Sequence, residues 1–167
     1  MTAVTLLTGS NLGKPQENLL AAYCAIEKNI GKITKHSGIY TSKAWGFESE
    51  DLFYNQAIVC MTDLDPEQLL FHIWDIEKSL GKPRGSQEDE LNKKAMIENG
   101  TASYESRYID IDILFYGNQI IETKLLTIPH KFLEARSFVL RPLCEIMADY
   151  LHPVSHKTIK TLLNELE

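Results

Sequence analysis

Residues 108–116, with the sequence Tyr-Ile-Asp-Ile-Asp-Ile-Leu-Phe-Tyr, constrain the fold more than any other segment of the chain. Isoleucine and aspartate alternate through the first half of this segment, and a period of two is the pattern of a β-strand. The isoleucines then share one face of the strand, which needs a hydrophobic core to cover it. Asp110 and Asp112 stand side by side on the opposite face. We therefore expect a sheet with one apolar face and a pair of carboxylates on the other.

Hydrophobic periodicity predicts the remaining elements and their order. Further strands are expected at Val4–Leu7, Ile33–Tyr40 and Tyr54–Thr62, with a loop at Thr41–Asp51. Helices are expected to begin at Pro15 and Pro66 and to end at Gly31 and Gly81. After a hairpin turn at Gly117-Asn118, we expect short strands at Ile120–Ile121 and Leu125–Ile128, a break at Leu140-Arg-Pro, and a terminal helix at Thr158–Glu165. The order β-α-β-β-α-β with a C-terminal extension predicts an α+β, ferredoxin-like fold with an antiparallel sheet and two helices on one face.

The second predicted helix has a clear beginning and one unusual side chain. Asp65 is suited to the N-cap, and Gln68 stands where its capping-box partner belongs. Glu77 lies at the edge of the apolar stripe of this helix. A carboxylate in that position needs a partner or a wet cleft.

The length of the chain predicts a single domain over residues 1–167. Residues 85–104 form a long polar stretch with glycine near both ends. Inside a compact domain, a loop of this length is usually a lid, a binding loop or a disordered segment. We interpret it as a lid.

Composition narrows the classes of function. The net charge of −6 argues against a nucleic-acid-binding protein, which needs a basic face. No apolar run is long enough to span a membrane, and the N-terminus lacks the basic region of a signal peptide, so a cytoplasmic location is expected. The three cysteines show no spacing typical of zinc ligands. All four arginines lie in the second half of the chain, which is compatible with an anion site there or with chance.

The carboxylate pair is the strongest candidate for chemistry. Two carboxylates on one strand face repel each other unless a positive group lies between them. Mg²⁺ is the natural candidate, because it binds one or two carboxylates together with substrate phosphates. Arg107, three residues before Asp110, could meet the same phosphates. The alternative is a solvated strand face on which one arginine balances two aspartates.

Other residues add weaker signals. The turn Thr8–Gly13 could bring backbone close to a ligand, but it has neither a Walker loop nor a dinucleotide fingerprint, so a P-loop kinase is not expected. His130 and Arg136 could donate to an anion. Flat surfaces and an amide for a planar heterocycle could come from Trp45, Phe53, Asn55 and Phe138. Taken alone, each of these residues more often has a core or loop role.

Taken in order, these motifs resemble the 6-hydroxymethyl-7,8-dihydropterin pyrophosphokinase family over nearly the whole chain. The matching segments are Gly9–Gly13, Tyr40–Gly46, Asn55–Ala57, Ile76-Glu77 with Gly81, Arg107 with Asp110–Leu114, Ile128–His130, and Arg136–Leu143. The resemblance implies transfer of pyrophosphate from ATP to a pterin alcohol, giving AMP and the pterin diphosphate for folate synthesis. It also implies a ferredoxin-like fold, in agreement with the order of elements.

The resemblance implies roles for individual residues. Asp110 and Asp112 would hold two magnesium ions that bridge the ATP phosphates. The nucleotide and its phosphates would be bound by Glu77, Lys82, Arg84, Arg107, His130 and Arg136, with Lys82 and Arg107 acting in catalysis. The pterin ring would lie between Phe53 and Phe138, and its hydrogen-bonding edge would be read by Asn55 and by the loop at Ser42, Lys43 and Trp45. The implied partners are these small molecules, with neither nucleic acid nor membrane, and we expect a monomer.

The chain departs from the family pattern in and around the predicted lid. Lys82 replaces a usual arginine, so a bidentate phosphate contact becomes a point charge. Glu105-Ser106 replaces a Gly-Pro pair, the loop is about ten residues longer than the short family form, and Tyr104 is the nearest aromatic residue to an expected tryptophan. Lid closure and nucleotide affinity are therefore the properties that the resemblance predicts least well.

Two other functions fit parts of the sequence. A non-catalytic ferredoxin-like module that binds a small ligand would keep the fold, but it has no use for Asp110, Asp112 and His130 together. A metal-dependent phosphohydrolase would need further His or Asp ligands at suitable spacing, and the sequence after Asp112 does not supply them.

Overall fold

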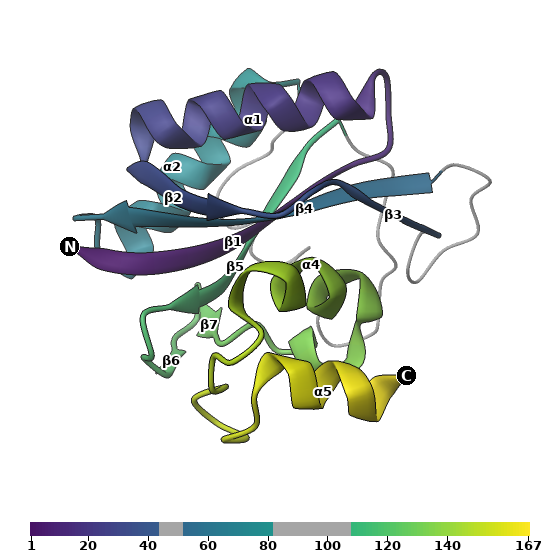
Figure 1. Ribbon diagram of the computed structural model, residues 1–167. Helices are drawn as coiled ribbons and strands as arrows, with labels where there is room; N and C mark the ends of the chain where they lie inside the picture. Colours follow the sequence, from purple (N-terminus) through teal and green to yellow (C-terminus); the bar gives the residue numbers. More distant parts are fainter. Residues whose placement is uncertain (44–51, 82–107) are drawn as a thin grey trace.

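The computed structural model describes residues 1–43, 52–81 and 108–167 of the chain (Figure 1). Its strands are β1 (Thr2–Ser10), β2 (Lys32–His36), β3 (Tyr40–Lys43), β4 (Leu52–Thr62), β5 (Asp110–Tyr116), β6 (Ile121–Glu122) and β7 (Thr127–Ile128). Its helices are α1 (Pro15–Asn29), α2 (Pro66–Ser79), α4 (Ser137–Met147) and α5 (Ile159–Leu166), with a 3-10 turn at Leu133–Ala135. The expected strand–helix order is confirmed.

The main sheet has the predicted split βαβ topology. Its strand order is β2-β4-β1-β5, and β3 continues the β2 edge by pairing with β4. Every strand pair is antiparallel. Helix α1 connects β1 to β2 across β4, and α2 connects β4 to β5 across β1. This arrangement confirms the ferredoxin-like fold.

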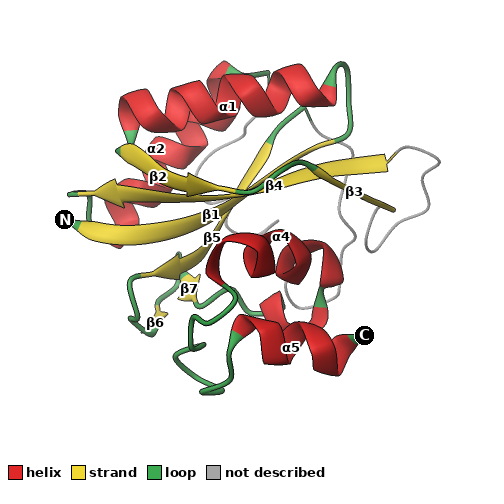
Figure 2. Ribbon diagram, in the orientation of Figure 1, coloured by secondary structure: helices red, strands yellow, loops and turns green. Residues whose placement is uncertain are grey.

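Helices cover both faces of the sheet (Figure 2). Helices α1 and α2 pack on one face, over a core that includes Leu6, Ile58 and Ile111. Helices α4 and α5 from the C-terminal extension pack on the other face, over a second core that includes Leu7 and Phe115. Strand β5 is therefore buried from both sides beyond Asp112, because Leu114 contacts the second core while the isoleucines contact the first.

A β-bulge adjusts the two faces of β5. Leu6 pairs with Ile113 and Thr5 pairs with Phe115, so Leu114 is an extra residue opposite β1. The extra residue turns Tyr116 to the same face as the isoleucines. The Tyr116 hydroxyl then donates to the Leu64 carbonyl at 2.7 Å.

Three expectations about local structure are wrong. The turn expected from Thr8 begins later, because β1 continues to Ser10 through its pairing with β4. The strand expected at Ile33–Tyr40 is broken after His36, and the chain resumes as β3, so part of the expected loop at Thr41–Asp51 is strand. The break expected at Leu140-Arg-Pro does not occur, because Pro142 lies inside α4. Burial of Val139, Leu140 and Leu143 on one side of α4 outweighs the hydrogen bond that Pro142 cannot donate. In α2, by contrast, the capping box of Asp65 and Gln68 is confirmed.

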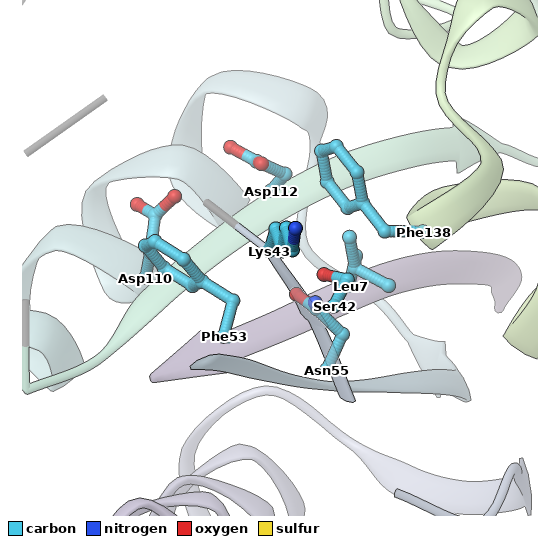
Figure 3. A pocket seen from close by; sticks show the side chains of 9 residues that line it. Leu7, Ser42, Lys43, Phe53, Asn55, Asp110, Asp112 and Phe138 are labelled. Carbon is cyan, nitrogen blue, oxygen red and sulfur yellow. The ribbon is translucent and has the colours of Figure 1, made fainter. Parts of the chain in front are cut away.

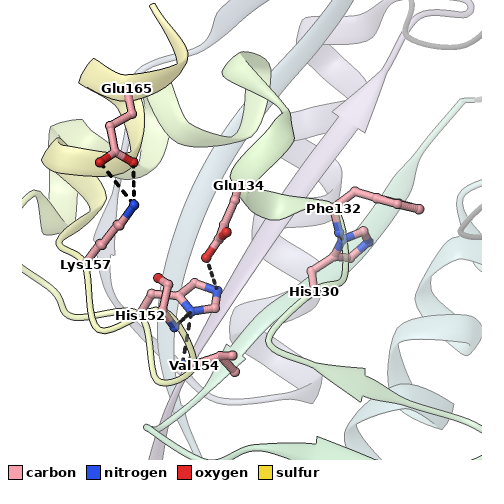
Figure 4. A network of polar contacts seen from close by, with 8 residues as sticks. His130, Phe132, Glu134, His152, Val154, Lys157 and Glu165 are labelled. Atoms are coloured by element: carbon pink, nitrogen blue, oxygen red, sulfur yellow. Dashed lines mark hydrogen bonds and ion pairs between the residues drawn. The ribbon is translucent and has the colours of Figure 1, made fainter.

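A histidine holds the loop that leads into α5 (Figure 4). The Nδ1 atom of His152 accepts from the backbone N–H groups of Val154 at 3.2 Å and Ser155 at 3.3 Å. Its Nε2 atom lies 3.7 Å from a carboxylate oxygen of Glu134, and its ring meets Phe115 edge-on at 5.7 Å between centroids. Burial lowers the pKa of His152, partly opposed by the Glu134 carboxylate. This cluster stabilises the C-terminal layer.

Among the residues that the structure describes, no helix has both the length and the apolar character needed to cross a bilayer.

Candidate functional site

A recess opens on the α4 side of the sheet (Figure 3). Its lining comes from three strands of the central sheet, from β3 and from α4. The lining residues are Leu7, Gly9, Ser42, Lys43, Phe53, Asn55, Asp110, Asp112 and Phe138. Seven of these were predicted as site residues from the sequence, and the fold brings all seven to one place.

Strand register explains why these residues meet. Directly opposite residues of antiparallel strands project to the same face. Gly9 of β1 pairs with Asn55 of β4 on one side and with Asp110 of β5 on the other. Leu7, two residues earlier, pairs with Asp112 on the β5 side. The floor of the recess is therefore a row of residues across the sheet, with the amide at one end and the carboxylates at the other.

Gly9 makes room for this recess. A Cβ atom added at Gly9 would lie 2.8 Å from Oδ1 of Asn55, which is closer than real Cβ contacts. The glycine therefore lets the Asn55 side chain lie flat across β1. The sequence indicates Gly9 only as part of a turn whose backbone could approach a ligand, and it does not indicate Leu7 as a site residue. The signal that could have found them is their alternation on β1, which puts both on the face of the predicted carboxylates.

Two polar atoms in the lining lack partners within the protein. Across the described part of the chain, Nδ2 of Asn55 and Oγ of Ser42 are buried without a hydrogen-bond partner. An unsatisfied buried polar group costs roughly 1–3 kcal/mol, so such groups usually serve a ligand or water. Ser42 pairs with Phe53 across β3 and β4, which places its hydroxyl beside that ring. The recess thus offers polar groups next to an aromatic face.

Two aromatic side chains come to the recess from different layers. Phe53 projects from β4, and Phe138 projects from the first turn of α4 (Figure 3). The buried guanidinium of Arg136 lies near both rings, with its Cζ 5.8 Å from the Phe138 ring centroid and 5.1 Å from that of Phe132. These cation–π contacts help to hold the Phe138 ring in place.

The carboxylates stand at the β5 side of the recess. Asp110 and Asp112 are half-buried, while Ile111 between them is buried in the core. Glu77 of α2 is buried and accepts the Ile111 backbone N–H at 3.2 Å. This bond is the partner that a carboxylate at the edge of the apolar stripe needs. Among the described residues no three His, Cys, Asp or Glu side chains cluster as metal ligands. Two carboxylates on one strand face are a donor set that Mg²⁺ accepts when phosphates complete its shell.

The remaining predicted site residues divide into two groups. His130 and Arg136 are buried and do not line the recess; Arg136 contacts Phe138, and the Nδ1 atom of His130 accepts the Phe132 backbone N–H at 3.4 Å (Figure 4). Trp45, Lys82, Arg84 and Arg107, together with the predicted lid at 85–104, lie outside the described residues.

The fold and the recess define a class, namely ferredoxin-like proteins with a small-molecule pocket on one sheet face. Residues 5–148 match the model of the 7,8-dihydro-6-hydroxymethylpterin-pyrophosphokinase (HPPK) family. The chain belongs to this family, and it is a pyrophosphokinase of folate biosynthesis. The resemblance found in the sequence is thereby confirmed.

Relatives agree with this family. A 2-amino-4-hydroxy-6-hydroxymethyldihydropteridine pyrophosphokinase of Aquifex aeolicus is 39% identical, over 96% of this chain and 89% of the relative. A folic acid synthesis protein of Pneumocystis carinii is 37% identical over 98% of this chain, which spans 20% of that longer protein. Among solved structures, wild-type HPPK-DHPS of Plasmodium falciparum with pteroate has a TM-score of 0.72 at 16% identity, covering 98% of this chain and 44% of that one. At this identity the likeness concerns the fold.

Proposed function

We propose that the recess binds the ring of 6-hydroxymethyl-7,8-dihydropterin and that Asp110 and Asp112 bind magnesium where the ATP phosphates meet it. The observation that carries the proposal is the row Asn55–Gly9–Asp110. It sets a buried amide nitrogen, which has no partner among the described residues, across one glycine from the carboxylate pair. A flat, polar heterocycle over Gly9 would form a hydrogen bond with the Asn55 amide at one end. Its hydroxymethyl group would then point toward the carboxylates.

The proposed ring contacts follow from the chemistry of the lining. Phe53 and Phe138 supply apolar faces for a planar ring. Nδ2 of Asn55 would donate to a ring acceptor, and the Ser42 hydroxyl can donate or accept at the same edge. Satisfying these buried groups favours a pterin over an apolar ring of the same shape, because the apolar ring leaves them unpaired.

The proposed ATP side rests on charge. A carboxylate pair repels phosphates by itself, so it can serve phosphoryl transfer only together with cations. Bound magnesium would neutralise phosphate charge at Asp110 and Asp112. Asp112 is also proposed to orient the attacking hydroxyl by accepting its hydrogen bond. Lys43 lines the same recess and Arg136 contacts Phe138 in its lining, so these side chains are proposed to add donors for the phosphates, together with the buried His130.

The proposed reaction needs positioning more than covalent help from the protein. The substrate hydroxyl oxygen attacks the β-phosphorus of ATP. The bond from the β-phosphorus to the α,β-bridging oxygen breaks, AMP leaves with that oxygen, and the hydroxyl proton is released. Holding the hydroxymethyl group in line with that bond supplies much of the rate enhancement.

A product assay tests the proposal. The full chain is incubated with ATP, Mg²⁺ and the reduced pterin alcohol, and nucleotides are separated. AMP should form in equal amount to the pterin diphosphate, and chelation of magnesium should stop both. Formation of ADP in place of AMP would show that a single phosphoryl group is transferred, and turnover in the presence of chelator would exclude the magnesium site.

Several expectations stay predictions from the sequence. They are the lid at 85–104, the single domain, the monomeric state, the cytoplasmic location, and the roles of Glu77, Lys82, Arg84, Arg107 and Trp45.

A further inference from the structure

Glu145 joins α4 to the connection between β2 and β3. One oxygen of its carboxylate accepts the Gly38 backbone N–H at 2.7 Å, and the other accepts the Tyr40 hydroxyl at 3.2 Å. Burial and then the Glu145 carboxylate raise the pKa of Tyr40, so this hydroxyl stays a donor at neutral pH. Both bonds cross between the helical layer and the sheet edge.

The connection that Glu145 holds contains one extra residue. His36 pairs with Ile58 and Tyr40 pairs with Asn55, so three residues of the β2–β3 edge lie opposite two of β4. The extra residue reverses the alternation of β3. Without it, Ile39 would stand opposite Asn55, and Ser42 would point away from the recess. The orientation of the Ser42 hydroxyl therefore depends on this irregular turn.

Side chains from two layers hold the turn in place. On the sheet side, Ser37 Oγ accepts the Ala57 backbone N–H at 2.9 Å, and Gln56 Nε2 donates to the Ser37 carbonyl at 2.9 Å. On the helix side, Glu145 accepts the two bonds described above. The sheet bonds set the position of Ser37, and Glu145 sets the positions of Gly38 and of Tyr40, the first residue of β3.

The face of α4 that carries Glu145 also carries Phe138, near the start of the helix. Phe138 and Glu145 are seven residues apart, which puts them on one side of α4 about 10 Å apart along its axis. Strand β3 provides Ser42 and Lys43 to one wall of the recess, and α4 provides Phe138 to another. A bond between β3 and α4 thus ties two walls of one pocket.

We propose that Glu145 is a positioning residue for the pterin pocket, which it keeps in shape by fixing β3 against α4. The proposal rests on the proposed function of the recess, because it assigns the geometry that Glu145 maintains to pterin binding. It predicts that loss of the carboxylate weakens the pterin site and leaves the magnesium and ATP side almost unchanged.

Amide hydrogen exchange tests the anchoring without any ligand. In Glu145→Ala, the Gly38 amide and the β3 amides should exchange faster than in the unmodified protein, by about tenfold for a lost hydrogen bond to a charged acceptor. Glu145→Gln keeps an acceptor for Gly38 and should restore slow exchange. Unchanged exchange in Glu145→Ala would overturn the proposal.

Kinetics test the consequence for the site. Glu145→Ala should raise the KM and Kd for the pterin about five- to tenfold, while kcat and the KM for ATP stay within about twofold. Tyr40→Phe, which removes one bond, should raise the pterin KM about twofold, and Glu145→Gln should recover most of the loss. The matched control is Glu165→Ala. Glu165 lies on α5, outside the lining of the recess, and its carboxylate accepts two bonds from Lys157.

The outcomes separate this proposal from the proposed function. If the unmodified chain forms AMP but Glu145→Ala leaves the pterin KM unchanged, or raises both substrate KM values equally, Glu145 is not a positioning residue. If the unmodified chain does not bind the pterin, the proposed function fails, and the exchange experiment still decides whether Glu145 anchors β3.

Discussion

In the described part of the chain, two helices cover each face of the sheet, but the sheet residues of the two faces differ in kind. Under α1 and α2 the sheet presents large apolar side chains such as Leu6, Ile58 and Ile113, all at most 3% exposed. Under α4 and α5 it presents Leu7 and Ala57, and then Gly9 and Asn55 toward the end of β1. One face is filled, and the other is left with a recess.

The difference shows how a pocket is made on a sheet. On the filled face even a thiol is inert, since burial raises the pKa of Cys60 to about 12. On the other face, the absence of a side chain at Gly9 lowers the floor, and α4 reaches the edge of the recess only with Phe138. At the start of β5, the buried isoleucines lie on one side and the proposed metal ligands Asp110 and Asp112 on the other. Substitutions of neighbouring β5 residues should therefore separate the two.

The largest effect is expected at Asp112. Asp112→Ala should lower kcat on the order of 10³-fold, because a lost metal ligand removes several kcal/mol of charge stabilisation. The midpoint of thermal unfolding should stay close to that of the unmodified chain, since the side chain projects away from the core. Steady-state AMP formation and a thermal melt measure the two quantities. Unfolding of Asp112→Ala would instead support the alternative of a purely structural carboxylate pair.

Ile111→Ala, one residue away, should show the opposite result. Ile111 is 2% exposed, and its truncation should lower the free energy of unfolding by about 2–5 kcal/mol through lost burial and a cavity. At a temperature where the variant is folded, kcat should stay within about threefold, because the Asp side chains keep their strand. Urea unfolding followed by circular dichroism gives the first value. Equal stability losses for Ile111→Ala and Asp112→Ala would remove the distinction between the faces.

The filled face was predictable from the sequence, and much of the open face was not. Alternating isoleucines and aspartates predicted which side of β5 is buried, and this is confirmed. The break after His36 depends on Ser37 and Glu145, which are far apart in sequence, so a local pattern could not reveal it. Pro142 was taken as a break because local backbone preference was weighed without the packing that overrides it. Gly9 was noted as a turn residue, and its place in the floor needed the strand register.

An intermediate effect is expected at Asn55. Asn55→Ala should raise the KM for the pterin roughly ten- to a hundredfold, through loss of one or two hydrogen bonds in a desolvated site. Stability should change little or rise slightly, because a buried Nδ2 without a partner in the described protein is removed. Pterin titration and urea unfolding measure the two quantities. A large stability loss with unchanged pterin affinity would place Asn55 in the scaffold.

Gly9→Ala should have a smaller effect of the same kind. The added Cβ would press on Oδ1 of Asn55 at 2.8 Å, and that side chain would have to turn. We expect the pterin KM to rise about threefold to tenfold, with the KM for ATP nearly constant. In the Asn55→Ala background, Gly9→Ala should raise the pterin KM only slightly, because Oδ1 of Asn55 is no longer present. Additive effects in this double-mutant cycle would contradict the direct contact.

The smallest effect concerns the polar cluster under α5, where the ring nitrogens of His152 already have partners in the protein. Burial holds the pKa of folded His152 below its ordinary value near 6.5, so the folded state binds fewer protons than the unfolded state in that range. The free energy of unfolding should therefore fall as pH drops below about 6.5. Protonation of Nδ1 would also end its acceptance of the Val154 and Ser155 N–H groups, although Glu134 attracts the charged ring and limits the loss.

His152→Gln isolates this contribution from other groups that titrate in acid. Urea unfolding at pH 7.5 and pH 5.5 should show a steeper loss of stability for the unmodified chain than for His152→Gln. Pterin affinity at pH 7.5 should be equal in the two proteins, because the cluster does not line the recess. Identical pH dependence would mean that His152 titrates normally in the folded state. A weakened pterin site in His152→Gln would mean that the satisfied cluster and the open recess on this face are coupled after all.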